Sequence, residues 1–160
     1  MPLEQIALTL SPELAVIIVA ALPVLELRGA VPLGLTLGLH PASTYILAVV
    51  GNMLPMPVIV TLLHPFMFRL RRSPRVSEII ESYYRRTRAK STHIKRYGFW
   101  GLVLFVALPL PSTGAWTGAI AACLLGLRFW PTMLALLLGT LLAGVIVTSV
   151  CLLGTATLLF

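Results

Sequence analysis

Two charged side chains lie alone in a long apolar stretch, and their types and spacing suit them best for chemistry. Between Leu14 and His64, Glu26 and Arg28 are the only charged residues. An acid and a base are costly to bury in such a segment, so they usually face each other, a water-filled cavity or a substrate path. Because residues at i and i+2 do not face each other on a helix, we expect each side chain to find a partner elsewhere.

The chemistry expected of this pair is proton exchange combined with anion binding. An apolar setting favours the protonated form of a carboxyl group, whereas a neighbouring arginine favours its ionised form. These opposed effects predict a proton switch at Glu26, and the alternative is a permanent structural pair of Glu26 and Arg28. The planar guanidinium of Arg28 is suited to binding a phosphate group with two hydrogen bonds.

Further candidate residues lie where proline and glycine interrupt the apolar segments. Proline and glycine are poor residues for the interior of a helix, and a helix that restarts after a break presents unpaired N–H groups to anions. The predicted substrate and proton site comprises Glu26, Arg28, Gly29, Pro32, Asn52, Pro109, Pro111, Ser112, Thr113, Gly114, Trp116 and Thr117.

These interruptions predict two half-helices whose N-termini point to the middle of the fold. We expect one to begin at Gly29 and Ala30 and the other at 113–115, with Ser112 or Thr113 as the N-cap residue.

Two of the polar candidates have a structural and a functional interpretation. The prolines of Gly51–Pro57 predict a kink in this helix, and Asn52 either satisfies the carbonyl groups that they free or contacts substrate. Trp116 either stacks on a substrate or fills space between hairpins.

The composition predicts an all-α integral membrane protein of a single domain, residues 1–160. Of its 160 residues 58% are hydrophobic and 11% are charged, whereas a soluble domain has about 25% charged residues. The run from Met133 to Leu153 is of the class that signals membrane spans. Cys123 and Cys151 lie in apolar segments without a nearby histidine, so we expect packing roles for both and neither a metal nor a cofactor.

Positive charge is concentrated in one segment between the apolar ones. The net charge is +7, and ten of the twelve Lys and Arg residues lie between Arg69 and Arg96. Such clusters mark the cytoplasmic side of a membrane, so we expect residues 69–96 to be cytoplasmic and to contact lipid rather than nucleic acid. Helical spacing of apolar side chains predicts an amphipathic helix here, with Val76, Ile79, Ile80, Tyr83 and Tyr84 on its apolar face.

Two membrane halves flank this segment and resemble each other in order. Residues 14–64 form the first repeat, 65–98 the basic amphipathic segment and 99–160 the second repeat. The matching pairs are Ala21-Leu22-Pro23 with Ala107-Leu108-Pro109, Gly29-Ala30 with Gly114-Ala115, His40-Pro41 with Trp130-Pro131, Gly51-Asn52-Met53-Leu54 with Gly139-Thr140-Leu141-Leu142, and Val58-Ile59-Val60-Thr61 with Val145-Ile146-Val147-Thr148.

Two topologies fit these halves. In the first, each half is a re-entrant broken-helix hairpin plus one transmembrane helix, and the two repeats are inverted. In the second, Leu14–Leu39 and Gly98–Leu127 are kinked full crossings and the repeats are parallel. The hairpin topology is favoured, because a break at membrane depth is tolerated only where protein or water covers it. It places the termini outside, whereas full crossings place them inside.

Three motifs resemble those of the putative small multidrug export family, a relative of the DedA/SNARE-associated (VTT) membrane proteins. They are Glu26–Pro32, Gly51–Pro57 and Pro109–Ala119, and the resemblance spans nearly the whole chain. It implies two opposed re-entrant hairpins in a prokaryotic inner membrane. DedA relatives are associated with lipid-carrier translocation and proton-dependent drug resistance. Where the usual pattern reads Pro-Gly-Thr-Gly, this chain has Pro111-Ser112-Thr113-Gly114.

The leading hypothesis is a proton-coupled transporter of an anionic amphiphile such as a polyprenyl phosphate. Glu26 would carry the proton, and Arg28 with the hairpin tips would hold the anion. The alternatives are a proton-coupled small multidrug exporter of cationic compounds and a non-transporting membrane scaffold. The sequence has no nucleophile–base pair or metal cluster, so we expect no enzyme activity. Expected partners are membrane lipids, protons and a second copy of the chain in a homodimer.

Overall fold

The computed structural model describes residues 11–70, 91–108 and 114–158, with side chains described for 11–63, 98–108 and 114–154. Every element in this part of the chain is a helix, as the composition predicts. The helices are α2 (Pro12–Ala21), α3 (Glu26–Thr36), α4 (Pro41–Met53), α5 (Met56–Leu70), α7 (Ser91–Ala107), α8 (Ala115–Leu124) and α9 (Phe129–Leu158).

Two helical stretches are long and apolar enough to cross a membrane. Pro41–Leu63 has 23 residues and Phe129–Gly154 has 26, and at about 1.5 Å per residue each exceeds a hydrocarbon core of about 30 Å. The first is divided between α4 and α5 at Leu54 and Pro55. The predicted kink at Gly51–Pro57 is therefore confirmed.

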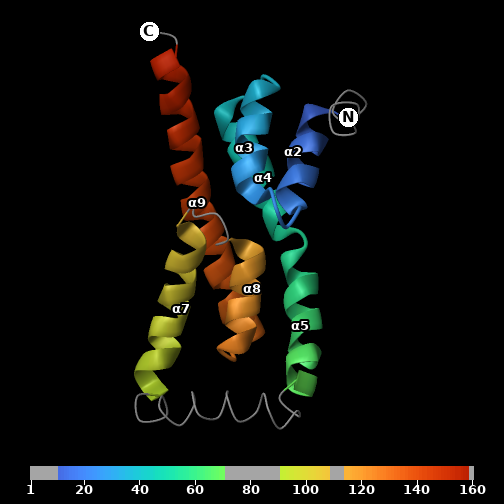
Figure 1. Cartoon of the computed structure of the whole chain (residues 1–160), viewed down its shortest axis with the longest axis vertical. Coiled ribbons are helices and arrows are strands. Elements are labelled where there is room, and N and C mark those ends of the chain that lie inside the picture. The colour runs from blue at the N-terminus through green and yellow to red at the C-terminus, as the bar shows by residue number, and fades with distance from the viewer. Residues whose placement is uncertain (1–10, 71–90, 109–113, 159–160) are drawn as a thin grey trace.

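The other apolar helices pair into two short hairpins. α2 and α8 have 10 residues each and α3 has 11, and the apolar part of α7 is Gly98–Ala107. Each of these lengths spans about half of a hydrocarbon core. Figure 1 shows the α2–α3 hairpin in the upper half of the molecule and α7 and α8 in the lower half, with α3 and α8 both beginning near mid-height.

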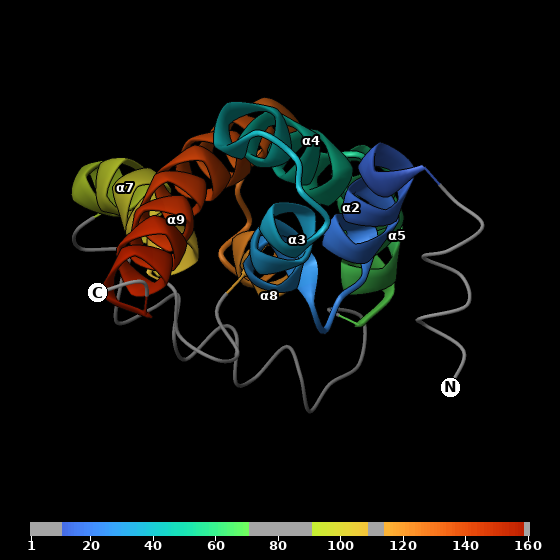
Figure 2. The same ribbon diagram turned by 90° about the horizontal axis from the view of Figure 1, so that it is seen from above.

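The crossing helices and the first arm of each hairpin form an arc, and the second arm of each hairpin lies on its inner side. In Figure 2, α7, α9, α4 and α2 follow the arc, and α3 and α8 lie within it. The N-terminal end of α2 and the C-terminal end of α9 lie at the top in Figure 1, opposite the end where α5 stops and α7 starts.

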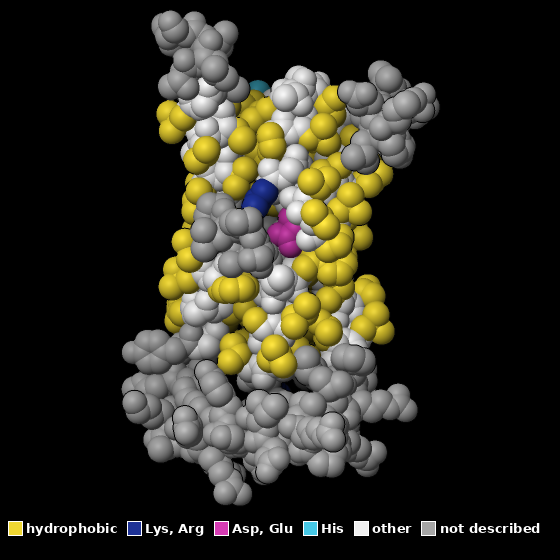
Figure 3. All heavy atoms as spheres, in the orientation of Figure 1, with side chains coloured by type: hydrophobic (Ala, Val, Ile, Leu, Met, Phe, Trp, Pro, Cys, Tyr) yellow, Lys and Arg dark blue, Asp and Glu magenta, His cyan; other side chains and the backbone are white. Residues whose placement is uncertain are grey.

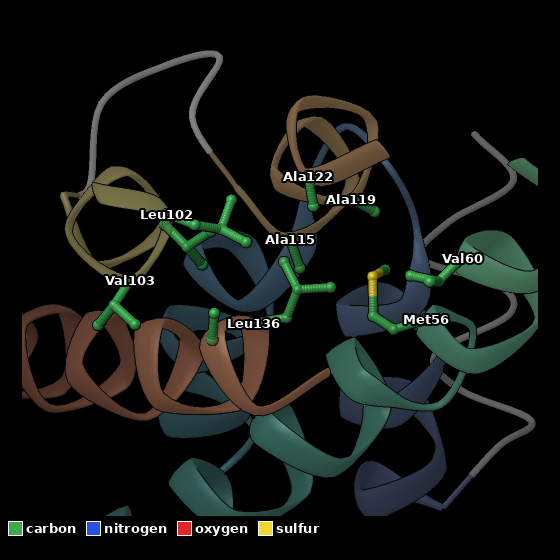
Figure 4. Packing of buried hydrophobic residues seen from close by; sticks show 10 residues of the cluster. Met56, Val60, Leu102, Val103, Ala115, Ala119, Ala122 and Leu136 are labelled. Atoms are coloured by element: carbon green, nitrogen blue, oxygen red, sulfur yellow. The ribbon is translucent and has the colours of Figure 1, made fainter. Parts of the chain in front are cut away.

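The lower core joins the α7–α8 hairpin to parts of both crossing helices. Figure 4 shows side chains of α5, α7, α8 and α9 converging. α9 contributes its N-terminal part to this cluster, and α5 is the C-terminal part of the other crossing. The buried members are Met56, Val60, Leu102, Val103, Val106, Ala115, Ala119, Ala122, Ala135 and Leu136.

The upper core is built from the equivalent elements of the first half of the chain. It joins the α2–α3 hairpin to α4, the N-terminal part of its own crossing, and to later residues of α9. The buried members are Val16, Ala20, Leu27, Ala30, Val31, Ala48 and Val49, and Leu141, Val147 and Cys151 of α9 pack against them.

Two glycines allow the same close approach in both halves. A Cβ at Gly51 of α4 would overlap the carbonyl oxygen of Ile17 in α2, and a Cβ at Gly139 of α9 would overlap the carbonyl oxygen of Val103 in α7. The two contacted carbonyls are 86 positions apart and the two glycines are 88 apart. Each crossing helix therefore packs on the first arm of its own hairpin at an equivalent place.

The bounds of the basic segment, 65–98, stay a prediction. α5 continues to Leu70 and α7 already starts at Ser91, so helix extends into both ends of the predicted segment 65–98. Helix formation depends on backbone hydrogen bonding, which continues past the point where the side chains turn polar. The predicted amphipathic face falls within 71–90, outside the described residues.

Candidate functional site

Glu26 is the first residue of the half-helix α3, and its carboxylate is buried at the junction of the two hairpins. Its side chain is 8% exposed, and its backbone has φ 48°. A residue other than glycine in this left-handed region carries local strain, which persists only where the surrounding structure imposes it.

The predicted start of α3 at Gly29 and Ala30 is wrong by three residues. The break lies at Leu22–Leu25, and both Gly29 and Pro32 lie inside the helix. Pro32 lies beyond the first turn of α3, so its missing N–H removes one possible hydrogen bond within the helix. The earlier start places Glu26 itself at the hairpin tip.

The Glu26 carboxylate binds the N-terminus of α8 in the other hairpin. The backbone N–H of Trp116 donates to Glu26 Oε1 at 3.4 Å, and the backbone N–H of Ala115 also faces the carboxylate. A Cβ at Gly114 would overlap the carboxylate, so only glycine leaves room for this contact. An anion at the first turn of a helix is stabilised by the unpaired N–H groups and the helix dipole.

The predicted N-cap of α8 is also corrected. The N-cap position is Gly114, and no capping side chain comes from its own residue. The Thr117 hydroxyl accepts from the Gly114 N–H at 2.9 Å and donates to the Gly114 carbonyl at 3.2 Å. Thr117 thus shapes the first turn of α8, and Glu26 supplies the acceptor that Ser112 or Thr113 was expected to provide. α8 begins at Ala115, the last residue of the predicted range 113–115.

Arg28 binds the opposite kind of helix end. Its Nη2 donates to the carbonyl oxygen of Leu108, directly after the last residue of α7, at 3.1 Å. A cation at a helix C-terminus is stabilised by the exposed carbonyls and the dipole. Figure 3 shows both charges at mid-height on one face, with hydrophobic side chains above and below them.

The two charges therefore hold the two hairpins together at their tips. The negative side chain lies at the positive end of α8, and the positive one at the negative end of α7. The i,i+2 spacing predicted partners outside α3 for both residues, and this prediction is confirmed.

Trp116 lies at this junction and Asn52 lies in α4, and each has a buried polar atom without a hydrogen-bond partner among the described residues. These atoms are Asn52 Oδ1 and Trp116 Nε1. Trp116 packs against the lower core, which agrees with its space-filling interpretation. Asn52 is 3% exposed and its oxygen receives no bond, so both interpretations of Asn52 stay open.

Four predicted site residues lie outside the described part of the chain: Pro109, Pro111, Ser112 and Thr113. The structure adds one residue that sequence reasoning passed over, Thr140 of α9, whose buried Oγ1 also lacks a partner among the described residues. The match of Gly51-Asn52 with Gly139-Thr140 contained the signal, because it puts a polar residue at the equivalent place in each crossing helix.

Fold and site together define a helical membrane protein with a charged junction at mid-height. A sequence model of the family described as "Putative small multi-drug export protein" matches residues 26–146. The chain belongs to this family. No curated protein and no solved structure matches it. The relation to DedA proteins is untested by these comparisons and stays a prediction.

Proposed function

We propose that the chain is a proton-coupled membrane transporter of an anionic amphiphile, built from two inverted repeats with re-entrant hairpins. The repeats are supported by the composition of the two cores, since each combines one hairpin, the start of its own crossing and a later part of the other. A half-turn rotation about an axis in the membrane plane relates such elements. The short hairpin arms support re-entry.

The proposed orientation puts the basic segment in the cytoplasm of a prokaryotic cell, with the protein in the inner membrane. Arginines and lysines between membrane segments favour that side. The start of α2 and the end of α9 lie opposite the end of α5 and the start of α7, which flank the basic segment in the chain (Figure 1). The start of α2 and the end of α9 would therefore face outside.

One observation carries the substrate class: an oxyanion already binds the N-terminus of α8, and it is the carboxylate of Glu26. A phosphate group has the same charge sign and acceptor atoms, so it fits the same N–H donors when Glu26 leaves them. Arg28 lies two residues away and offers bidentate binding to phosphate. Glu26 and the substrate would thus alternate at one set of donors.

Proton coupling follows from this alternation. A protonated carboxyl group has no net charge and is held less strongly at a helix N-terminus than a carboxylate. Protonation of Glu26 would free the donors for the anion, and loss of the proton would return the carboxylate and expel the anion. This cycle moves a proton together with an amphiphile whose tail stays in lipid. It needs binding and movement, and no bond of the substrate is made or broken.

A second candidate is export of cationic compounds, which agrees more closely with the family description. The observation that favours it is the carboxylate of Glu26, which would attract a cation and has no second carboxylate beside it among the described residues. Arg28 and the positive end of α8 both oppose a cation at this place. The geometry therefore favours the anion.

Transport in liposomes under a pH gradient separates these functions. A headgroup-labelled polyprenyl phosphate and a cationic dye are followed side by side with wild type, Arg28→Ala, Arg28→Lys and Glu26→Gln. Arg128→Ala and Glu13→Gln are matched controls, since these two exposed residues lie at helix ends.

We expect Arg28→Ala to lower lipid-phosphate transport by roughly tenfold or more, equivalent to about 1.4 kcal/mol of binding, and Arg28→Lys to retain part of it. Glu26→Gln should remove the pH dependence. Dye movement that persists or rises in Arg28→Ala, with no lipid movement in wild type, would favour cation export. If wild type moves neither substrate, the scaffold interpretation replaces transport.

A further inference from the structure

Two oxygen atoms in the middle of the crossing helices are buried without a hydrogen-bond donor among the described residues. Asn52 is 3% exposed and Thr140 is 1% exposed, and neither Asn52 Oδ1 nor Thr140 Oγ1 has a partner. Buried polar atoms of folded proteins nearly always have one. The two residues occupy equivalent places, because each directly follows the glycine at which its helix packs on a hairpin.

The hydroxyl of Thr140 differs from those of Thr132 and Thr61, whereas Thr44 Oγ1 and Thr148 Oγ1 also lack a partner among the described residues. The hydroxyl of a helical threonine commonly donates to the carbonyl four residues earlier. Thr132 does so to Arg128 at 2.9 Å, and Thr61 does so to Pro57 at 2.7 Å. Thr140 makes no such bond, so its hydroxyl is left to serve another partner.

The helix register places Asn52 at the level of Glu26. A Cβ at Gly34 of α3 would contact the side chain of Thr44 in α4, so these two positions lie opposite each other. The two helices run in opposite directions. Glu26 is eight residues before Gly34, and Asn52 is eight residues after Thr44. At about 1.5 Å per residue, Glu26 and Asn52 each lie about 12 Å from the Gly34–Thr44 contact, in the same direction along the helix axes.

The same register places Thr140 at the level of Gly114. A Cβ at Gly118 of α8 would contact the side chain of Leu136 in α9, and these helices also run in opposite directions. Gly114 is four residues before Gly118, and Thr140 is four residues after Leu136 on the same helix face. Gly114 is where the Glu26 carboxylate binds, so both orphaned oxygens lie at the depth of that carboxylate.

We propose that Asn52, Thr140 and Glu26 bind a small monovalent cation, either a hydrated proton or Na⁺. Amide, hydroxyl and carboxylate oxygens are the donor set that hard cations prefer, and a hydronium ion donates hydrogen bonds to the same atoms. A cation of this kind would supply the partner that these buried oxygens lack.

Charge balance makes this cation the partner of the proposed anion. With Glu26 on α8, the negative carboxylate and positive Arg28 offset each other. When the carboxylate turns to the cation, the N–H groups of α8 and Arg28 need a new negative charge. A substrate phosphate supplies it, so cation and anion bind together. This coupling rests on the proposed function, whereas the cation site itself does not.

No other charged side chain in the described part of the chain faces this site. Arg28 on α3 is the remaining charge at this depth, and its guanidinium is directed to Leu108. Glu13, His40 and Arg128 lie at helix ends. The described side chains of α5, α7 and α8 include no charged residue.

The test measures cation binding on the purified full chain in detergent, without transport. Thermal unfolding is followed as Na⁺ replaces choline at constant ionic strength and pH. In parallel, the infrared band of the protonated Glu26 carboxyl group, assigned by its loss in Glu26→Gln, is titrated with pH. The variants are Thr140→Val, Thr140→Ser and Asn52→Leu. Thr44→Val is the matched control, because Thr44 Oγ1 is equally buried and unpartnered but lies two turns away.

If Na⁺ is the ion, it should raise the unfolding temperature of wild type, Thr44→Val and Thr140→Ser by several degrees and leave Thr140→Val and Asn52→Leu unchanged. If the ion is a hydrated proton, Thr140→Val should shift the midpoint of the carboxyl band by roughly half a pH unit, and Thr44→Val should not. The proposal is overturned if neither readout separates Thr140→Val from Thr44→Val. Cation binding without lipid-phosphate transport would instead reject only the transport function.

Discussion

The hairpin of α2 and α3 carries the buried Glu26 and the half-buried Arg28, whereas the described side chains of α7 and α8 carry no charge. In packing the two hairpins are alike, since each lies on its own crossing helix at a glycine and shares a core with the other crossing. In chemistry they are complementary, because α3 supplies the side chains and the second hairpin supplies the helix ends that bind them. The packing that the two repeats share positions the site. The difference between them puts both charged side chains on α3 and the helix ends that bind them on the second hairpin.

The largest effect should come from closing the space at the second hairpin tip. In Gly114→Ala the new Cβ would overlap the Glu26 carboxylate, which is held between helices, and transport should be lost with a destabilisation of about 2–3 kcal/mol. In Gly29→Ala the nearest atom is Leu25 Cβ at 3.0 Å within the same hairpin, so the effect should be smaller. Thermal unfolding and transport of both variants measure the difference. Equal effects would show that the tips are equivalent.

Gly51→Ala and Gly139→Ala test whether the two crossing helices pack on their hairpins alike. Both new Cβ atoms would overlap a backbone carbonyl oxygen that cannot move aside, so each variant should lose about 1–3 kcal/mol. Gly154→Ala is the control, since nothing lies within 4 Å of its Cβ position. If only one of the two central variants unfolds at a lower temperature, the halves do not pack alike.

Neutralising Glu26 should have a moderate effect on stability. Glu26→Gln keeps the size of the side chain and an acceptor oxygen but removes the charge at the N-terminus of α8, which should cost about 1 kcal/mol. Glu13→Gln is the control with the same change in charge. Double substitution with Gly114→Ala tests the contact itself, and additive losses would mean that the two residues do not interact.

Trp116→Phe should have the smallest effect. The ring packs on the lower core and its Nε1 has no partner among the described residues, so phenylalanine keeps most of the packing and removes an unsatisfied donor. We expect a change below about 1 kcal/mol and retained transport. Loss of substrate affinity at unchanged unfolding temperature would instead assign the ring to substrate stacking.

Much of the fold could be predicted because it follows from local composition. Apolar runs identify the crossing helices, Pro55 marks the kink, and the i,i+2 spacing of the charges predicts partners elsewhere. Apolar stretches interrupted by proline and glycine predict breaks, but they do not fix the residue at which a helix restarts. α3 begins at Glu26, because the tertiary contact of its carboxylate with α8 outweighs the helix-breaking preference of Gly29 and Pro32.

The partners at the site could not be predicted for a related reason. The contacts of Glu26 with Trp116 and of Arg28 with Leu108 join residues 90 and 80 positions apart, and one sequence contains no signal for such pairs. The role of Gly114 likewise depends on a side chain from the other hairpin.

The central claim is that two hairpins enter from opposite sides and return, and membrane sidedness tests it most directly. In a chain with Cys123 and Cys151 replaced by serine, single cysteines are introduced as Ser11→Cys at the start of α2, Gly154→Cys near the end of α9 and Ser91→Cys at the start of α7. A membrane-impermeant maleimide is applied to intact and to permeabilised cells. We predict labelling of positions 11 and 154 in intact cells and of position 91 only after permeabilisation. If all three positions are labelled only after permeabilisation, both hairpins are full crossings and the account is wrong.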